Sequence, residues 1–429
     1  MEHAIFFASS EPKDLYCLRP LENAVKSRLG RIMLIDVFDY RETEIRELVF
    51  SRCPIVVCAS LIARDMVALF RNGEPFVSVG IEHGFSPFKS YTFGEHFLRH
   101  DIYFAPSSLW ADRLSRLYSP PLGKIVVGGY PRAHEMDELL RRSASQRFDT
   151  LDVRYWRGVP RSRRKLVIFS WGVNPEELSS LPDSSEIVYL LHPADERLFS
   201  GSSFKLASLV VSSPELTALL LANAGLILGD FSSLTFEAVY FGLAPFFFIC
   251  RNLYLSDCDM TEEFFRRGSS KFANIPHTDH QIDPGAILDF DSFLALLGRK
   301  SDDLSDLRVR PLQLPNGFLP PSEFNSRSFI AEGILALAKK AGEPGDYAED
   351  QARRSRIDAI MVLADGYRKI LKRKPDGPGI SHYLPKLTSR ELTINERVAK
   401  FNAALANSPE SQQKNGAHAC GLERGTSHK

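Results

Sequence analysis

The feature that most constrains the fold is an alternation of short apolar runs with amphipathic stretches, which occurs twice along the chain. Apolar runs of four to six residues, separated by helical stretches, are typical of parallel strands buried on both faces of a sheet. The sequence therefore predicts α/β domains of the doubly wound, Rossmann-like type. In the N-terminal part, the predicted strands are 4–8, 31–37, 54–59, 75–79, 101–105 and 124–127.

A polar and basic segment over residues 141–164 interrupts this alternation, which then starts again. Single cores stop growing near ~250–300 residues, so a chain of 429 residues has room for two domains and a tail. We predict an N-terminal domain over 1–150, a second domain over 151–345 and a tail over 346–429. In the second domain, the predicted strands are 166–170, 186–191, 207–211, 226–228 and 245–249, with helices over 214–222 and 234–241.

The tail is predicted to be helical over 353–374, where apolar residues recur at helical spacing and basic residues flank them at both ends. Such a helix can lie on the inner face of a membrane, with its cations near anionic lipid. The alternative, which we favour, is that the apolar stripe packs on the second domain and leaves the charges in solvent. A further helix is expected over 323–340, and disorder over 405–429.

Composition excludes several classes of protein. The formal net charge is +0, which gives no indication of a nucleic-acid partner. The six cysteines form no CxxC pair and no zinc-finger spacing, which favours free thiols in a reducing compartment. We find no secretory signal and no apolar run of membrane-spanning length. The expected location is the cytoplasm, with peripheral contact at the inner membrane face as an open alternative.

Two loops that follow predicted strands contain a histidine. His83-Gly84 follows the fourth strand, and a histidine there can act as a general base on a hydroxyl. His192-Pro193 ends a buried strand abruptly, and its imidazole can donate to a phosphate. For each, the alternative is a histidine that only makes loop hydrogen bonds.

The third loop is the most specific of the three. An apolar strand runs into Gly229-Asp230-Phe231-Ser232-Ser233 and then directly into a helix. A helix N-terminus offers N–H donors and a positive dipole end, and the serines add hydroxyl donors, so this loop predicts an anion site. The alternative is plain N-capping of the helix by Asp230 or Ser232.

Taken together, these motifs resemble the CDP-glycerol glycerophosphotransferase family, which comprises teichoic-acid polymerases and capsule-forming relatives. The similarity extends from about residue 83 to residue 248. The matching motifs, in chain order, are His83-Gly84, Ala105-Pro106-Ser107 with Trp110-Ala111, Gly129-Tyr130-Pro131-Arg132, Leu191-His192-Pro193, and Asp230-Phe231-Ser232-Ser233 with Phe236-Glu237 and Pro245-Phe246. The resemblance implies a GT-B-like fold, in which two Rossmann-like domains face a cleft.

The resemblance also implies roles for individual residues. His83 would be the catalytic base that activates the acceptor hydroxyl, and Asp230 would shape the phosphate loop or contact the acceptor. The donor would be bound by His192, Ser232, Ser233, Gly229 and Arg132. No metal and no cofactor are expected, because a helix dipole and side-chain cations can stabilise the leaving phosphate. The first domain would bind the acceptor and the second the nucleotide donor.

Several positions depart from the family pattern. Phe85-Ser86-Pro87-Phe88-Lys89 has one residue more than the usual segment, Leu190 stands where a cation often precedes Leu-His-Pro, and Ala133-His134 replaces Asn-Asp. A family arginine is also replaced in the segment Trp171-Gly172-Val173-Asn174. Fewer cations near a diphosphate should change donor preference or weaken binding.

The predicted function is therefore a transferase of cell-surface polymer synthesis. It would move a polyol phosphate or sugar phosphate from a CDP-linked donor to a polymer or a lipid-linked acceptor. Two alternatives stay open: a GT-B glycosyltransferase that uses a nucleotide sugar, and a catalytically silent binding subunit of a surface-polymer complex. A UDP-sugar 2-epimerase shares the architecture, but these motifs do not support it.

Overall fold

The computed structural model describes most of the chain. The described residues are 4–28, 31–82, 84, 86, 99–117, 124–145, 155–196, 209–211, 213–250, 253–255, 286–299, 310–314, 316–319, 325–340, 351–371, 377–388 and 394–409. The chain divides into two compact units, Met1–Gly80 with Ala331–Lys429, and Ile81–Ile330. The domain limits predicted from the sequence, at residues 150 and 345, stay a prediction.

The first sheet is six-stranded, with the order β2-β1-β3-β4-β5-β6. The pairings β1 with β2, β1 with β3, β3 with β4 and β5 with β6 are parallel. β1 and β3 are buried along their whole length, as expected for apolar strands with helices on both faces. The strands are β1 (Ile5–Ser9), β2 (Ile32–Asp36), β3 (Ile55–Cys58), β4 (Val77–Ile81), β5 (Ile102–Ala105) and β6 (Lys124–Val127).

The second sheet is also six-stranded and has the order β12-β11-β10-β7-β8-β9. Counted along the chain from β7, this is the 3-2-1-4-5-6 order of doubly wound dinucleotide-binding folds, whose topological switch point lies between β7 and β10. Ligands of such sheets bind beyond the carboxyl ends of the strands at that point. The strands are β7 (Lys165–Ile168), β8 (Ile187–Leu191), β9 (Leu209–Val211), β10 (Leu226–Gly229), β11 (Phe246–Phe248) and β12 (Ile287–Leu288).

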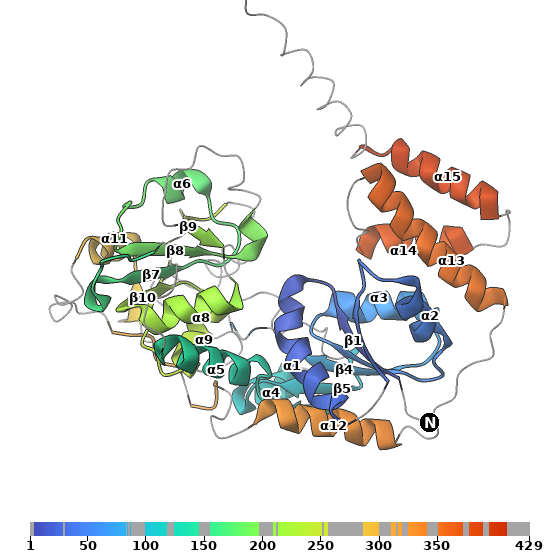
Figure 1. Ribbon diagram of the computed structural model, residues 1–429, viewed down its shortest axis with the longest axis horizontal. Helices are drawn as coiled ribbons and strands as arrows, with labels where there is room; N and C mark the ends of the chain where they lie inside the picture. The colour runs from blue at the N-terminus through green and yellow to red at the C-terminus, as the bar shows by residue number, and fades with distance from the viewer. Residues whose placement is uncertain are drawn as a thin grey trace, which may run out of the picture. The chain divides into compact units, whose positions relative to one another are not determined.

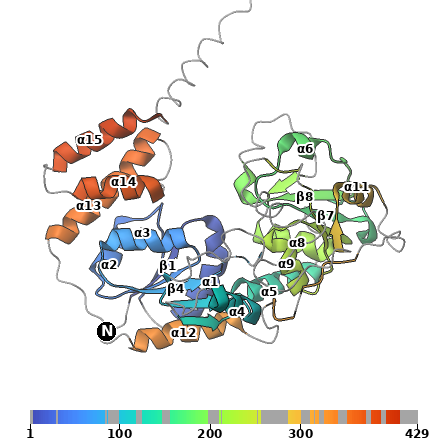
Figure 2. The ribbon, with the colours of Figure 1, turned by 180° about the vertical axis from the view of Figure 1, so that it is seen from behind.

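Helices accompany the strands in both units (Figures 1 and 2). In the second unit, α5 lies beside α8, and Met136 of α5 belongs to the core cluster that also contains Leu220 of α8 (Figure 2). The helices up to residue 340 are α1 (Leu15–Lys26), α2 (Glu42–Phe50), α3 (Leu61–Arg71), α4 (Ser108–Leu117), α5 (Arg132–Ser145), α6 (Pro175–Ser179), α8 (Pro214–Asn223), α9 (Ser233–Tyr240), α11 (Phe290–Gly298) and α12 (Ser326–Lys340).

The prediction of an α/β protein with two Rossmann-like sheets is confirmed, and each strand predicted from the sequence is present. β12 was not predicted from the sequence, because a strand of 2 residues is too short for a periodic pattern. Two helices were also not predicted, α14 (Gly377–Thr388) and α15 (Ile394–Ala406). Gly377, Gly379 and the Pro385 inside α14 are residues that usually signal turns.

The predicted tail helix forms α13 (Gln351–Gly366), which continues as a π-helical turn over Tyr367–Leu371. Its apolar stripe is buried inside the first unit: Ile360, Ala364, Tyr367 and Leu371 join the core cluster that contains side chains of α2 and α3. In Figure 1, α13 and α14 lie beside α2 and α3, and the contacts of α13 with α2 and of α14 with α3 agree with this. The stripe therefore packs on the N-terminal sheet's helices and not on the second domain, which corrects the expected partner.

We expect Ile360→Ala to lower the free energy of unfolding by ~2–5 kcal/mol, because it opens a cavity in this core. Ile360 is 1% exposed, and its backbone carbonyl also accepts a hydrogen bond from Tyr40 Oη at 3.1 Å. Chemical denaturation followed by circular dichroism measures the change. Ile62→Ala is the matched control, since Ile62 is 48% exposed. Equal effects of the two substitutions would contradict the packing of α13.

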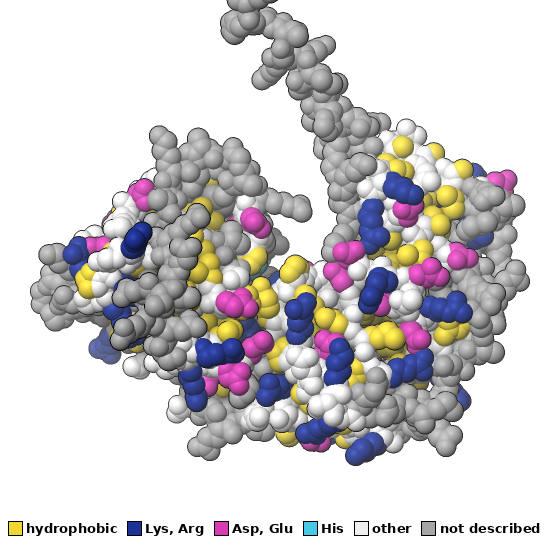
Figure 3. Space-filling model, in the orientation of Figure 1, with side chains coloured by type: hydrophobic (Ala, Val, Ile, Leu, Met, Phe, Trp, Pro, Cys, Tyr) yellow, Lys and Arg dark blue, Asp and Glu magenta, His cyan; other side chains and the backbone are white. Residues whose placement is uncertain are grey.

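On the face shown in Figure 3, the side chains over the first unit mix both signs of charge with apolar groups, and no large patch of one sign stands out. Two cations of the α13 region are paired with carboxylates: Arg368 with Asp39 at 2.6 Å, and Lys369 with Asp365 at 2.7 Å. None of the described helices is both long enough and apolar enough to cross a membrane.

Candidate functional site

The switch point of the second sheet is organised around the buried carboxylate of Asp230, the first residue after β10. Its Oδ2 accepts a hydrogen bond from the Ser170 amide at 2.6 Å, and its Oδ1 accepts one from the Ser232 amide at 2.7 Å. The hydroxyl of Tyr254 also donates to Oδ2. Asp230 thus joins the loop after β7 to the loop after β10, and it fixes the chain where α9 begins.

The sequence-based roles for Asp230 were catalysis or shaping of the phosphate loop. The side chain is 0% exposed, and both of its oxygens accept hydrogen bonds. Burial raises the pKa of Asp230 to about 6, although its hydrogen bonds from Ser170, Tyr254 and Ser232 oppose the shift. This environment favours the loop-shaping role, while a catalytic role for Asp230 stays a prediction.

The raised pKa predicts a pH dependence of stability. A carboxyl whose folded pKa lies above its unfolded value stabilises the protein below the unfolded pKa, near 3.8, and loses this contribution as the pH rises through about 6. Relative to Asp230→Asn, which does not titrate, the wild-type free energy of unfolding should therefore fall by about 2–3 kcal/mol between pH 4 and pH 7.5. Denaturation curves across this range measure the difference, and parallel curves for the two proteins would contradict the shift.

The N-terminus of α9 carries the two serines that the sequence predicted as phosphate ligands. Ser232 is the N-cap, and its Oγ accepts a hydrogen bond from the Leu234 amide at 3.3 Å. Ser233 is the first helical residue, and its Oγ is buried without a hydrogen-bond partner among the described residues. Capping therefore accounts for the Ser232 hydroxyl, but it does not account for that of Ser233.

Gly229 is the last residue of β10 and lies under α9. A Cβ atom at this position would be 2.3 Å from Thr235 Oγ1 and 2.6 Å from Thr235 Cγ2. The missing side chain lets α9 pack closely on the strand that leads into it. The structure thus gives Gly229 a steric role, and direct contact with a donor stays a prediction.

We expect Gly229→Ala to destabilise the protein by ~1–3 kcal/mol through this clash. Thr235→Ala in the same chain should restore part of the loss, because it removes Oγ1 and Cγ2 but keeps the Cβ atom, which would still be 2.9 Å away. Thermal unfolding of the single and double variants measures both effects. Gly298→Ala is the control, since a Cβ atom at Gly298 meets nothing within 4 Å. Failure of Thr235→Ala to rescue would contradict the clash.

The loop after β4 reaches the same helix end. The Ser86 hydroxyl donates to the backbone carbonyl of Phe231 at 2.5 Å. A Cβ atom at Gly84 would lie 2.5 Å from Ser233 Oγ, so the backbone at Gly84 passes close to that hydroxyl. The predicted base, His83, lies outside the described residues, as does Lys89. The motif that contains His83 nevertheless meets the predicted phosphate loop through residues on its C-terminal side.

The loop after β6 meets α9 one helical turn further along. The hydroxyl of Tyr130 donates to Glu237 Oε1 at 2.7 Å, and Arg132 Nη1 donates to the same oxygen at 3.3 Å. The Glu237 side chain is 0% exposed and that of Arg132 is 14% exposed. The sequence analysis gave Arg132 a donor-binding role but assigned none to Tyr130 or Glu237, although both stand in the quoted motifs.

His192 lies at the end of β8 and is half-buried. Three residues later, the buried Asp195 accepts hydrogen bonds from the amide of Gly172, at 2.9 Å to each oxygen, and from the amide of Val173 at 3.3 Å. Burial raises the pKa of Asp195. Asp195 thus anchors the loop after β7, and the sequence analysis did not identify it, although an acidic residue just beyond His-Pro was a visible signal.

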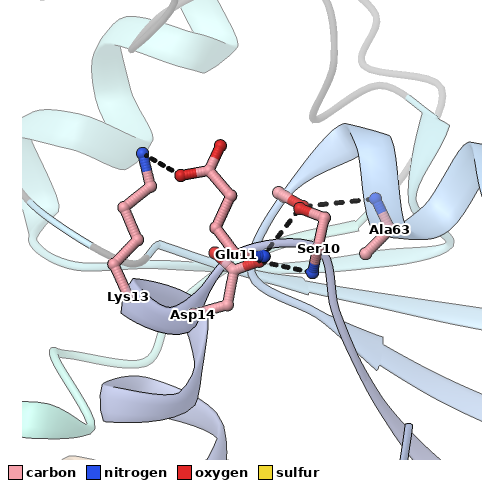
Figure 4. A network of polar contacts seen from close by, with 6 residues as sticks. Ser10, Glu11, Lys13, Asp14 and Ala63 are labelled. Atoms are coloured by element: carbon pink, nitrogen blue, oxygen red, sulfur yellow. Dashed lines mark hydrogen bonds and ion pairs between the residues drawn. The ribbon is translucent and has the colours of Figure 1, made fainter. Parts of the chain in front are cut away.

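At the corresponding switch point of the first sheet, between β1 and β3, the residues after β1 form a network of polar contacts with one another (Figure 4). Asp14 is buried, and its Oδ2 accepts hydrogen bonds from the Ser10 amide at 2.9 Å, the Ser10 hydroxyl at 3.1 Å and the Glu11 amide at 3.2 Å. The Ser60 hydroxyl lies 2.7 Å from that of Ser10 and caps α3 through the Ala63 amide. An internal carboxylate thus occupies donors that an anion would need, which favours the second sheet as the phosphate site.

Comparisons with known proteins give a fold similarity without a family. No protein-family model matches the chain, and no curated protein matches it. The chain is similar to the structure of UDP-N-acetylglucosamine 2-epimerase from Rickettsia bellii, with 12% identity, coverage of 87% of this chain and 100% of that chain, and a TM-score of 0.47.

It is also similar to the wall teichoic acid polymerase TagF, with 15% identity, coverage of 79% of this chain and 89% of that chain, and a TM-score of 0.47. A third similar structure is the glycosyltransferase SnogD from Streptomyces nogalater, with 14% identity, coverage of 79% and 99%, and a TM-score of 0.36. Similarity at this level shows the fold and carries no functional argument.

The structure therefore brings together five of the predicted site residues at or beside α9: Arg132, Gly229, Asp230, Ser232 and Ser233. His192 lies at the end of β8, which pairs with β7. Among the described residues, no group of three or more His, Cys, Asp or Glu side chains is arranged to hold a metal ion. The site offers hydroxyl, amide and guanidinium donors, which are the groups that bind phosphate.

Proposed function

We propose that this chain is a transferase that takes a nucleotide-activated donor, in which the diphosphate binds at the N-terminus of α9. The observation that carries the proposal is the buried Ser233 hydroxyl, without a hydrogen-bond partner among the described residues, at the start of a helix that begins at the switch point of a doubly wound sheet. A helix N-terminus at that position supplies amide donors and a favourable dipole for an anion.

The motifs support a more specific proposal. Their similarity to the CDP-glycerol glycerophosphotransferase family favours a CDP-linked donor and the transfer of a polyol phosphate or sugar phosphate. The acceptor would then be a surface polymer or its lipid-linked precursor, reached from the inner membrane face by peripheral contact. In this mechanism His83 takes the proton of the acceptor hydroxyl as that oxygen attacks the phosphorus. The P–O bond to the nucleotide breaks, and Ser232, Ser233 and Arg132 stabilise the departing phosphate.

The identity of the donor needs a direct test, because the cations of the family pattern are replaced near Leu190 and Trp171. A panel of CDP-, UDP-, GDP- and CMP-linked compounds, titrated into the full-length protein by calorimetry, tests the donor class. We expect a cytidine compound to bind most tightly. Preference for UDP-sugars would instead favour the alternative of a sugar transferase, and product analysis by mass spectrometry separates the two enzymes.

A catalytically silent binding subunit of a surface-polymer complex is the alternative from a different class. The replaced cations favour it, whereas the preserved Ser232-Ser233 helix start favours an enzyme. Such a subunit would bind a nucleotide donor without releasing the free nucleotide. Chromatography of the reaction products after incubation with donor and lipid-linked acceptor distinguishes the two, because only a transferase accumulates the nucleotide product.

A further inference from the structure

One face of α9 carries both the candidate phosphate ligand and a buried carboxylate. Ser233 and Glu237 are four residues apart, so they lie on the same face of the helix, ~6 Å apart along its axis. The Glu237 side chain is 0% exposed, and it accepts hydrogen bonds from the hydroxyl of Tyr130, in the loop after β6, and from the guanidinium of Arg132, the first residue of α5. Arg132 is thereby held about one helical turn from the N-terminus of α9.

The contacts of Glu237 are unevenly distributed between its oxygens. Tyr130 and Arg132 both donate to Oε1, whereas Oε2 is buried without a partner in the described part of the chain. Arg132 donates to the carboxylate through Nη1, at 3.3 Å, while its Nη2 contacts Met136 Sδ at 3.8 Å. A strong arginine–carboxylate pair is bidentate, with two N–H groups on two oxygens. The pair is therefore monodentate, and Glu237 holds the guanidinium through one of its nitrogens.

Arg132 has two possible arrangements when a diphosphate binds at the N-terminus of α9. Arg132 can leave Glu237 for the phosphate, or it can keep Glu237 and contact the phosphate with another nitrogen. If Arg132 left, the fully buried carboxylate would keep the Tyr130 hydroxyl as its one partner among the described residues. Breaking a buried pair costs more than one charge-assisted hydrogen bond returns. A guanidinium has five N–H donors, so it can serve two anions at once. The shared arrangement is therefore favoured.

We propose that Glu237, supported by Tyr130, is a positioning residue that holds Arg132 so that its guanidinium binds a diphosphate oxygen while it stays paired with the carboxylate. This inference rests on the proposed function, because the anion is the donor diphosphate at the start of α9. Glu237 does not touch the substrate and acts through Arg132. Lysine cannot replace Arg132, since an ammonium lacks the fork that reaches two anions in fixed directions.

Calorimetric titration of the full-length protein with inorganic pyrophosphate, and separately with CDP, tests the inference. We expect Arg132→Gln to lower pyrophosphate affinity by ~10–100-fold and Glu237→Gln by ~3–10-fold. Arg132→Lys should behave nearly as Arg132→Gln. In the Arg132→Gln background, Glu237→Gln should cause no further loss, because its effect passes through Arg132.

The matched control is Glu186→Gln, which alters another arginine–glutamate pair, formed with Arg163 next to the amino ends of β7 and β8. It should leave pyrophosphate affinity unchanged. Tighter binding of pyrophosphate by Glu237→Gln would overturn the inference, because it would show that Glu237 and the phosphate compete for Arg132. So would a loss that persists in the Arg132→Gln background, or an Arg132→Lys variant that binds like the wild type.

The comparison of Arg132→Lys with the wild type needs no substitution of Glu237. The inference can therefore be refuted even if Glu237→Gln does not fold. Binding of CDP and UDP tests the proposed donor class separately from the positioning role of Glu237. If pyrophosphate binds with the expected pattern while CDP and UDP do not, the positioning role stands and the proposed donor class fails. If the wild type binds no pyrophosphate, the inference itself is overturned.

Discussion

Replacing His83 with alanine is expected to lower the turnover of group transfer by ~10²–10⁴-fold, the usual contribution of a general base. The expectation rests on the His83-Gly84 motif and on the anchoring of the residues around it. Glu82 is buried and accepts a hydrogen bond from the Tyr103 hydroxyl, while Gly84 passes against Ser233. A small side chain at position 83 should therefore leave the loop and the fold intact.

The measurement is release of the free nucleotide under saturating donor and acceptor, with thermal unfolding to verify the fold. His382→Ala is the matched control, because His382 is an exposed histidine on α14 and belongs to none of the motifs. The wild-type rate should also rise with pH through the range in which histidine loses its proton, and the rate of His83→Ala should not show this rise. Near-normal turnover in His83→Ala would remove the residue from the mechanism.

The sequence predicted the sheets well because their signal is local. An apolar run of three to seven residues between helical stretches identifies a buried parallel strand without knowledge of its partners. The same logic placed Asp230, Ser232 and Ser233 at a strand-to-helix junction, where the structure has them. The tail helix was also predicted, but its partner was not, because an amphipathic stripe specifies that it will be buried and does not specify where.

The parts of the site that the sequence did not reveal depend on contacts between distant residues. Arg132 and Glu237 are separated by 105 positions, and each alone resembles an ordinary surface charge. Tyr254 and Ser170 reach Asp230 from 24 and 60 positions away. Polar residues of this kind are usually exposed, and only the fold shows that these are buried and paired. Their hydrogen bonds set the position of α9, on which the predicted phosphate ligands depend.

The double substitution Ser232→Ala with Ser233→Ala is expected to weaken binding of the best nucleotide in the donor panel by ~1–3 kcal/mol, or ~5–150-fold. The physical reason is the loss of hydroxyl donors to phosphate oxygens, since hydrogen bonds to charged groups are stronger than neutral ones. The single variants separate this effect from capping. Ser232→Ala removes the N-cap bond to Leu234 and should also lower the free energy of unfolding by ~1 kcal/mol.

Ser233→Ala removes a hydroxyl that has no partner among the described residues, so it should weaken ligand binding without a loss of stability. Calorimetric titration and chemical denaturation of all three variants provide the two readouts. The control is the double alanine variant of Ser179 and Ser180, another adjacent pair, whose hydroxyls bond to backbone carbonyls of α6. If Ser233→Ala binds the nucleotide as tightly as the wild type and only Ser232→Ala changes stability, then Ser232 serves as a helix cap and the phosphate site lies elsewhere.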